Sequence, residues 1–271
     1  MADKHYPITF LSLSSSSCGN CFYLESNDCS ILIDAGVGIR SIERWLAERD
    51  IDIRSVSAIL LTHDHTDHIK SAGSLSKKYG IPVYVTEDTY DALLNIPSIS
   101  TKPTADSVRY ITKGEPFVLD CFIIEAFALP HDASDTVGYN ISVGDKRFAF
   151  LTDLGYLPLS AERYVEEATH LIIESNYDEG MLADSLYPPS VQRRISGNNG
   201  HLSNIQAAEY IAELYHPELE RVWLCHLSKD SNTPQRALSA THQALCRIGV
   251  QDCVEVVALP RKEPSEVYII E

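Results

Sequence analysis

Metal-binding side chains crowd the segment THDHTDH at positions 62–68. His63 and His65 alternate along the chain, so in an extended backbone both rings point to the same side. Asp67 and His68 follow where a helical pattern begins. Imidazole nitrogens and carboxylate oxygens are the ligands that zinc and similar divalent metals accept. Histidines placed this close together are hard to explain as structural residues, so the segment predicts a metal site.

Further candidate ligands each stand at the end of an apolar run that is typical of a β-strand. His131 ends CFIIEAFALPH, Asp153 ends RFAFLTD, and His226 ends RVWLCH. Functional groups gather at the carboxyl ends of strands because the loops there vary over a rigid frame. Any one of these residues alone would more often be structural. Together with THDHTDH they favour a cluster of nitrogen and oxygen ligands.

The candidate ligands divide into two sets joined by one carboxylate. The first set is His63, His65 and His131. The second set is Asp67, His68 and His226. Asp153 bridges the two sets. Water shared by two such ions loses a proton readily and becomes a hydroxide nucleophile at about pH 7. Zinc is the expected metal, and manganese and iron accept the same ligands. Asp34, which ends the run SILID, is either a strand-end turn residue or an acceptor that orients one imidazole.

A long polar excursion, SNYDEGMLADSLYPPSVQRRISGNNG, covers 175–200 and is predicted to be an active-site loop. His201 follows it, just before a helix whose Ser203 and Gln206 fit a capping box. A helix N-terminus favours anions such as phosphate, so His201 would bind a phosphoryl oxygen there or protonate a leaving group. The alternative is a histidine that only caps the helix or fills the core.

Glu174 ends the apolar run HLIIE and would reach the same edge of a sheet as His201. A carboxylate beside an imidazole fixes the tautomer of the ring and raises its pKa, which keeps a proton ready to give. We therefore predict His201 as the general acid with Glu174 as its partner. Asp67 is expected to serve in catalysis as well as in metal binding.

Short β-branched and aromatic runs, separated by helical or turn-rich stretches, dominate the 271 residues. The early runs follow one another as hairpins with SNDCS and GDK as turns, and the later runs alternate with helices. This mixture predicts an α/β (α+β) fold with sheet packed on sheet and helices outside. No linker divides the chain, so a single domain over 1–271 is expected. The helices are predicted at 41–49, 68–79, 87–95, 160–167, 203–215 and 233–247.

Net charge and hydropathy limit the classes of function. With 22 Lys and Arg against 38 Asp and Glu, the net charge is −16. A uniform surface of that sign would repel nucleic acid, although bound metal ions can make a local site positive. No window has the roughly 18 apolar residues of a membrane helix, and MADKHYPITF does not resemble a signal peptide. We expect a cytoplasmic protein that does not contact a membrane.

The series HxHxDH, then a strand-end His, Asp and His, resembles the ligand series of metallo-β-lactamase-fold hydrolases. The resemblance spans nearly the whole chain. It implies a four-layer αββα sandwich with a two-metal site at one edge of the sheets. An Asp at position 153 is similar to the phosphodiesterase, lactonase and glyoxalase branches of that family.

Other segments resemble the YycJ (WalJ) subfamily, which implies a DNA exonuclease acting from the 5′ end. They are ESNYDEGML, YPPSVQRRISGNNGHLSN, HLSKDSNTP, and SSSSCGNC, in which Ser15 stands where Gly is usual. The resemblance matches His201 and Glu174 to the non-ligand pair of the phosphodiesterase branch. Arg193, Arg194 and Asn204 then become candidate substrate contacts, because Arg binds phosphate bidentately. Outside this resemblance, the two arginines are a solvated pair in a loop.

Two other functions stay open. One is a small-molecule hydrolase on the same two-metal site, acting on cyclic phosphodiesters, lactones or thioesters. The other is a metal-dependent scaffold without catalysis, although a purely structural site does not need an open metal position. Ser228 and Asn232, in HLSKDSN, are expected to order the loop after His226. The oligomeric state is left open.

Overall fold

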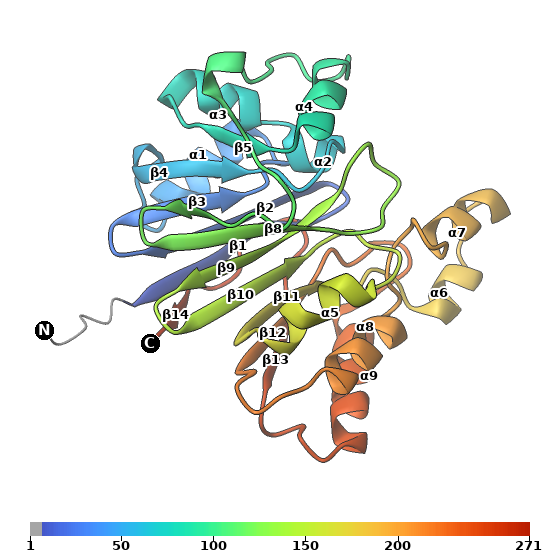
Figure 1. The fold of residues 1–271 in the computed structure, drawn as a ribbon. Coiled ribbons are helices and arrows are strands. Elements are labelled where there is room, and N and C mark those ends of the chain that lie inside the picture. Colours follow the sequence, from blue (N-terminus) through green and yellow to red (C-terminus); the bar gives the residue numbers. More distant parts are fainter. Residues whose placement is uncertain (1–6) are drawn as a thin grey trace, which may run out of the picture.

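Two β-sheets lie face to face, and helices cover the outer side of each sheet (Figure 1). The structure is a computed structural model that describes residues 7–271. One apolar cluster fills the space between the sheets. A second cluster lies between the first sheet and its helices, and a third lies between the second sheet and its helices. The layers are therefore helix, sheet, sheet, helix, as the resemblance implies. The expected domain starts at residue 1, and positions 1–6 lie outside the described residues.

The first sheet takes its strands from the first part of the chain and from the C-terminal end. Its pairs are antiparallel from β14 to β3 and parallel from β3 to β6. Asn27 and Asp28 have φ of 49° and 61°, which suits a two-residue hairpin turn within the predicted turn SNDCS. The spatial order is β14 (Tyr268–Ile270), β1 (Ile8–Ser16), β2 (Gly19–Ser26), β3 (Cys29–Ile33), β4 (Val56–Leu60), β5 (Val83–Val85) and β6 (Val108–Tyr110).

The second sheet repeats this pattern. Its pairs are antiparallel from β7 to β10 and parallel from β10 to β13. Gly144, with φ of 59°, makes the predicted turn between β9 and β10. The spatial order is β13 (Glu255–Ala258), β12 (Arg221–Cys225), β11 (His170–Glu174), β10 (Lys146–Leu151), β9 (Val137–Val143), β8 (Phe122–Ala128) and β7 (Phe117–Leu119).

Most helices lie on the outer faces of the sheets. Those on the first sheet are α1 (Ile39–Ala47), α2 (Thr66–Ile69), α3 (Ala72–Tyr79) and α4 (Glu87–Leu94). Those on the second are α5 (Leu159–Glu166), α8 (Asn204–Glu213) and α9 (Pro234–Arg247). Short 3₁₀ turns cover Ile53–Ser55 and Ala105–Ser107. Among residues 7–271, no helix combines the length and the apolar character needed to cross a bilayer.

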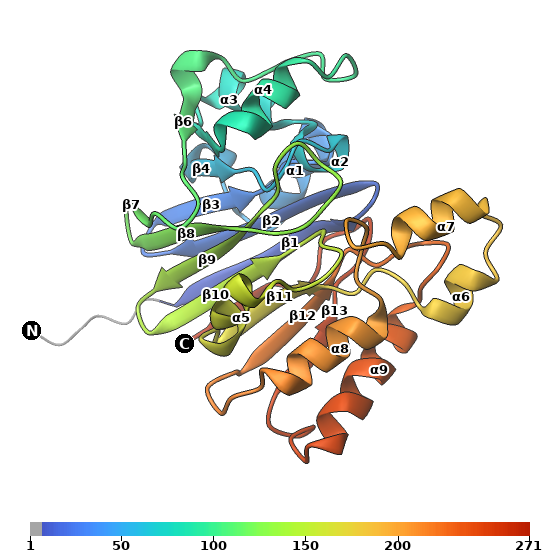
Figure 2. The ribbon, with the colours of Figure 1, turned by 45° about the vertical axis from the view of Figure 1, so that its right-hand side comes forward.

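The excursion 175–200 is not the continuous loop that the sequence predicts. It contains two short helices, α6 (Glu179–Ala183) and α7 (Pro189–Ile195), which stand beyond the edge of the sheets (Figure 2). Pro189 occupies the first helical position, where a missing N–H costs no helical hydrogen bond. The Pro-Pro pair therefore marks a helix start as well as a turn.

The predicted helix 68–79 is interrupted, because the backbone around residue 70 bonds to another segment. Ser71 N donates to Ala35 O (2.8 Å), and Ala35 N donates to His68 O (2.7 Å). These bonds separate α2 from α3 and tie the segment 62–68 to the end of β3. The other predicted helices match the structure with small shifts at their ends.

The strands alternate their side chains between two apolar layers. In β11 and β12, Ile172 and Trp223 face the other sheet, whereas Leu171 and Leu224 face the helices. A strand buried on both faces reads as a continuous apolar run. Polar residues collect where the strands end.

Candidate metal centre

The carboxyl ends of central strands from both sheets carry the predicted ligands. β4 leads into 62–68, β10 into Asp153, and β12 into His226. Asp34, Asp153 and His226 have φ of 60°, 51° and 52°, a left-handed region that residues other than glycine rarely adopt. Such backbone strain persists where the surrounding structure fixes it, and it concentrates at functional sites.

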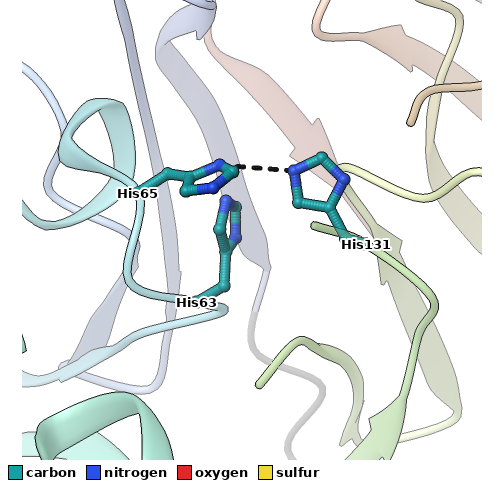
Figure 3. Close-up of side chains that lie close together, drawn as sticks. All are labelled: His63, His65 and His131. Carbon is teal, nitrogen blue, oxygen red and sulfur yellow. Dashed lines mark hydrogen bonds between the residues drawn. The ribbon is translucent and has the colours of Figure 1, made fainter. Parts of the chain in front are cut away.

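His63, His65 and His131 bring three imidazole rings together across the two sheets (Figure 3). His65 Nδ1 lies 3.3 Å from His131 Nε2. The ring of His63 is centred 4.7 Å from that of His65 and 5.1 Å from that of His131. One nitrogen from each ring falls within 4.8 Å of the others, which suits a shared metal ion.

The second nitrogen of each ring is held from outside the group. The contacts are His63 Nδ1 to Thr62 Oγ1 (2.9 Å), His65 Nε2 to Asp132 O (3.2 Å) and His131 Nδ1 to Gly200 O (2.9 Å). Such outer contacts orient a ring and select the nitrogen that faces a metal. Burial lowers the pKa of His63 and of His131, so both rings favour the neutral form that binds metals.

Asp67, His68 and His226 form the second predicted group. Asp67 Oδ2 lies 3.7 Å from His68 Nε2 and 3.6 Å from His226 Nε2. On its other side, His68 Nδ1 lies 2.6 Å from Oδ2 of the fully buried Asp34. Asp34 also accepts a hydrogen bond from Thr62 N (2.9 Å). Asp34 is thus fixed in the place of an orienting carboxylate for His68.

Asp153 lies between the two groups. Its Oδ2 is 3.0 Å from His68 Nε2, and its Oδ1 is 3.9 Å from His131 Nε2. Within the described part of the chain, the buried Nε2 atoms of His63 and His226 have no hydrogen-bond partner. Unpartnered buried nitrogens are costly unless something binds them. The donors and their geometry therefore fit divalent metal ions.

His201 and Glu174 stand beside this cluster as a hydrogen-bonded pair. His201 Nδ1 lies 2.7 Å from Glu174 Oε1. Glu174 Oε2 accepts from Leu154 N and from Leu202 N, at 3.1 Å each. Burial alone would raise the pKa of Glu174, but the neighbouring imidazoles lower it to about 2. Burial lowers the pKa of His201, yet Glu174 outweighs this and leaves it raised.

A cavity of about 180 Å³ opens onto the cluster. His65, Asp67, Asp153, His201 and His226 line one side of it. Val191, Arg194 and Ile195 of α7 line another side. The helix from the excursion 175–200 thus forms a wall of the candidate site.

The predicted substrate contacts have different surroundings. Arg194 lines the cavity and pairs through Nε with Asp132 Oδ2. Arg193 instead lines a separate hollow beside α6. Asn204 is buried, and its side-chain amide is used by bonds to Ser175 (2.6 Å) and Asn232 (2.8 and 2.9 Å). Both polar atoms of this side chain thus bond to neighbouring residues, and the substrate contact of Asn204 stays a prediction.

The start of α8 uses three of its backbone N–H groups within the protein. The capping box is confirmed, with Gln206 N donating to Ser203 Oγ (3.1 Å) and Ser203 N donating to Gln206 Oε1 (2.9 Å). Asn204 N donates to Tyr177 O (2.8 Å). These N–H groups are therefore occupied, and the helix start does not offer them to a phosphate. His201 gains its setting from Glu174 and the ligand cluster instead.

Several polar residues of the site were not predicted as site residues from the sequence. Asn20 Nδ2 lies 2.9 Å from His68 Nε2, and Ser15 Oγ accepts from His226 N (2.8 Å). Asn176 Nδ2 donates to His226 O (3.0 Å). Their positions in SSSSCGNC and ESN carry no ligand-like spacing, so only proximity reveals them. Ser228 and Asn232 do order the loop after His226, through bonds to Asn176 O at 2.8 and 3.0 Å.

Comparisons with known proteins agree with this geometry. Exodeoxyribonuclease YycJ of Bacillus anthracis is 32% identical over 263 residues, which cover 96% of this chain and 98% of that protein. Exodeoxyribonuclease WalJ of Streptococcus pneumoniae is 35% identical over 225 residues, 83% of each chain. The crystal structure of the metallo-beta-lactamase fold protein YhfI from Bacillus subtilis superposes with a TM-score of 0.71 at 17% identity, covering 97% of this chain and 99% of YhfI.

The likeness to YhfI concerns the fold, because sequence identity is low. The family model of the beta-lactamase superfamily domain matches residues 30–227, which include every candidate ligand. The matched span and the clustered ligands agree in assigning metal-dependent hydrolysis. This chain belongs to the beta-lactamase superfamily and is a metal-dependent hydrolase.

Proposed function

We propose that this chain is a two-metal phosphodiesterase that removes nucleotides from the 5′ end of DNA. The observation that carries the proposal is the pair of His201 and Glu174, 2.7 Å apart, beside the ligand cluster. A proton donor next to metal ligands is what cleavage of a phosphodiester requires, since the leaving oxygen must be protonated. The names of the two exodeoxyribonuclease relatives support DNA as the substrate.

We assign the metal ligands to two sets, as the sequence suggests. His63, His65 and His131 would hold one ion, Asp67, His68 and His226 would hold the other, and Asp153 would contact both. Two divalent ions bound there would supply positive charge at the phosphate and acidify a bound water. Zinc is the expected metal, with manganese and iron as alternatives, because all three accept nitrogen and oxygen donors.

In this proposal, His201 and Glu174 supply the proton that the leaving oxygen needs. Hydrolysis adds the oxygen of one water to phosphorus and breaks the bond from phosphorus to the leaving oxygen. His201, with Nδ1 held by Glu174, presents its other nitrogen as the proton donor to that oxygen. Glu174 stays ionised beside it, because the neighbouring imidazoles hold its pKa at about 2. The carboxylate thereby fixes the ring and stabilises its charged form.

The size of the cavity limits what reacts inside it. About 180 Å³ is below the roughly 300–1,000 Å³ of pockets that enclose drug-sized ligands. The cavity beneath α7 would hold the reacting phosphate and the atoms next to it, whereas the rest of a DNA strand must lie outside. Arg194, which lines the cavity, is placed to exchange Asp132 for a phosphate oxygen.

A small-molecule hydrolase is the second candidate. The small cavity and the net charge of −16 favour it, since acidic surfaces repel long polyanions. A cyclic phosphodiester, a lactone or a thioester would fit the same ligand cluster.

A cytoplasmic location stays a prediction from the sequence.

One experiment separates the two candidates. Protein reconstituted with zinc or manganese is incubated with 5′-labelled and 3′-labelled DNA and RNA, and in parallel with a cyclic phosphodiester, a lactone and a thioester. Release of mononucleotides from the 5′ end of DNA supports the exonuclease. Turnover of a small substrate with all the nucleic acids intact would replace the exonuclease by the second candidate.

A further inference from the structure

A second and larger hollow lies at the same edge of the second sheet. Its volume is about 610 Å³, and it sits where β13 ends, next to the end of β12 that carries His226. Lys229, Arg261 and Lys262 line it together with Pro234 and Pro260. We call it the outer cavity. None of the chemistry proposed above uses it.

Arg261 joins the wall of the outer cavity to the loop that follows His226. Its Nε donates to Leu227 O (3.0 Å), and its Nη2 donates to Ser228 O (2.7 Å) and Asn232 O (2.8 Å). The guanidinium therefore fixes the segment that carries Lys229. All three acceptors are carbonyl oxygens, and the nearby carboxylate of Asp230 acts on the guanidinium charge without a hydrogen bond to it among those that hold this segment.

The other side of Arg261 contacts the serine segment next to the metal cluster. Arg261 O accepts from Ser14 Oγ (2.8 Å) and from Ser16 Oγ (3.0 Å). Ser17, the next residue, lines the 180 Å³ cavity. The two cavities are thus neighbours, separated by the segments 14–17 and 226–229.

The outer cavity carries an excess of positive charge in a chain with a net charge of −16. Lys229 and Lys262 are exposed, and neither forms an ion pair with any residue in 7–271. Asp230, beside Lys229, has its carboxylate bonded to Tyr187 Oη (3.0 Å). Among the described residues, Glu263 is the one acidic residue that lines the hollow. Free lysines concentrated this way attract a polyanion locally.

We propose that the outer cavity binds the DNA strand beyond the nucleotide being cleaved, with Lys229 and Lys262 contacting its phosphates. The inference rests on the proposed exonuclease function and names the surface that such a substrate needs outside the small reaction cavity. Pro234 and Pro260 add apolar walls against which a sugar or a base can pack. Phosphate contacts of this kind position a strand without reading its sequence.

The test compares salt dependence in matched variants. The reconstituted enzyme, the double variant Lys229→Gln/Lys262→Gln and the control Lys77→Gln are assayed over a range of NaCl concentrations. Lys77 is an exposed residue of α3, on the opposite outer layer, and forms no ion pair within the described chain. The substrates are a 5′-labelled DNA oligonucleotide and bis(p-nitrophenyl) phosphate, which is too small to reach the outer cavity.

For DNA, kcat/KM of the double variant falls at low salt, and its log–log salt slope becomes less steep by about 0.7–0.9 per lysine lost. The Lys77→Gln control keeps the slope of the unmodified enzyme, and all three proteins hydrolyse bis(p-nitrophenyl) phosphate equally. Equal slopes for the double variant and the unmodified enzyme would overturn the role of the outer cavity alone. Intact DNA with the unmodified enzyme would instead reject the exonuclease function itself.

Discussion

One oxygen of Glu174 holds both a proposed catalytic residue and a candidate metal ligand. Oε1 lies 2.7 Å from His201 Nδ1 and 2.8 Å from His226 Nδ1. The strand β11 ends at this residue, so the carboxylate is fixed by the sheet as well as by its bonds. Proton donation and metal binding are therefore coupled through one side chain, and substitutions can separate them.

Replacing His201 tests the acid role alone. In His201→Ala the leaving oxygen loses its proton donor, so kcat for phosphodiester hydrolysis should fall by about 10²–10⁴-fold. The bound metal should remain, because the two ligand sets that we propose, around His63 and around Asp67, do not include this ring. Metal content by atomic emission and kcat on bis(p-nitrophenyl) phosphate give the two measurements. Unchanged turnover would remove His201 from the mechanism.

Replacing Glu174 should affect both functions. In Glu174→Gln the carboxylate no longer balances the two imidazoles, so kcat should fall and the affinity for one metal ion should weaken. Loss of an outer contact to a ligand typically costs about 10–100-fold in metal affinity. Competition with a chromophoric chelator measures that affinity, with His201→Ala as the matched comparison. Metal affinity equal to that of His201→Ala would show that the bond from Glu174 to His226 has no role in metal binding.

Asp34 offers a cleaner test of a contact behind a ligand. Its Oδ2 lies 2.6 Å from His68 Nδ1, and it lies on the far side of that ring from Asp67. Asp34→Asn keeps the shape but removes the charge that orients and polarises His68, so the affinity for the second ion should fall by about 10–100-fold. The first ion, held by His63, should bind as before. If a titration shows that the affinities for both metal ions are unchanged, Asp34 is only a turn residue at the end of its strand.

Arg193 and Arg194 form a matched pair, since they are adjacent and both exposed but only Arg194 lines the reaction cavity. Arg194→Gln should raise KM for DNA, because a phosphate contact is lost. Arg193→Gln should leave KM near that of the unmodified enzyme. Steady-state kinetics on one oligonucleotide distinguish the two variants. Equal changes in both would point to net charge rather than to a contact.

The ligand series was predictable because a metal site imposes residue types at strand ends. His131, Asp153 and His226 lie far apart in sequence, yet each follows an apolar run, and the sheets bring those ends to one edge. Glu174 was predictable from its strand end in the same way, whereas His201 was predictable from its place just before a helix. Their roles in the reaction remain predictions for the variants above to test.

The parts that could not be predicted from the sequence depend on contacts between segments that lie far apart in the chain. Asn204 reads as a polar residue near the site, but the structure uses its amide to join Ser175 and Asn232. The break between α2 and α3 depends on the backbone of Ala35, which no local pattern reveals. The contacts of Arg261 could not be predicted either, because its partners are backbone carbonyl oxygens, which every residue has.

A buried histidine away from the metal cluster should control stability in acid. His170, at the start of β11, stacks on Phe148 (4.9 Å between ring centres) and near Trp223 (5.6 Å). Burial, assisted by the positive charges of Arg221 and Lys146, lowers its pKa to about 3. The unfolded chain has a pKa of about 6.5 for histidine, so between that pH and about pH 3 only the unfolded state binds the proton at this residue. The free energy of unfolding should therefore drop, as pH falls from about 6.5 towards 3, by up to about 1.4 kcal/mol per pH unit from this residue.

His170→Phe keeps a ring in the stack and removes the titrating group. Its free energy of unfolding should depend less on pH than that of the unmodified protein between about pH 6.5 and pH 4. Above about pH 7 this titration contributes no slope in either protein, so any difference there reports packing and the lost bond to Thr169 Oγ1 (2.9 Å). Urea denaturation of both proteins without metal, at several pH values, gives the two curves. Parallel curves through the acid range would show that His170 is not the group that titrates.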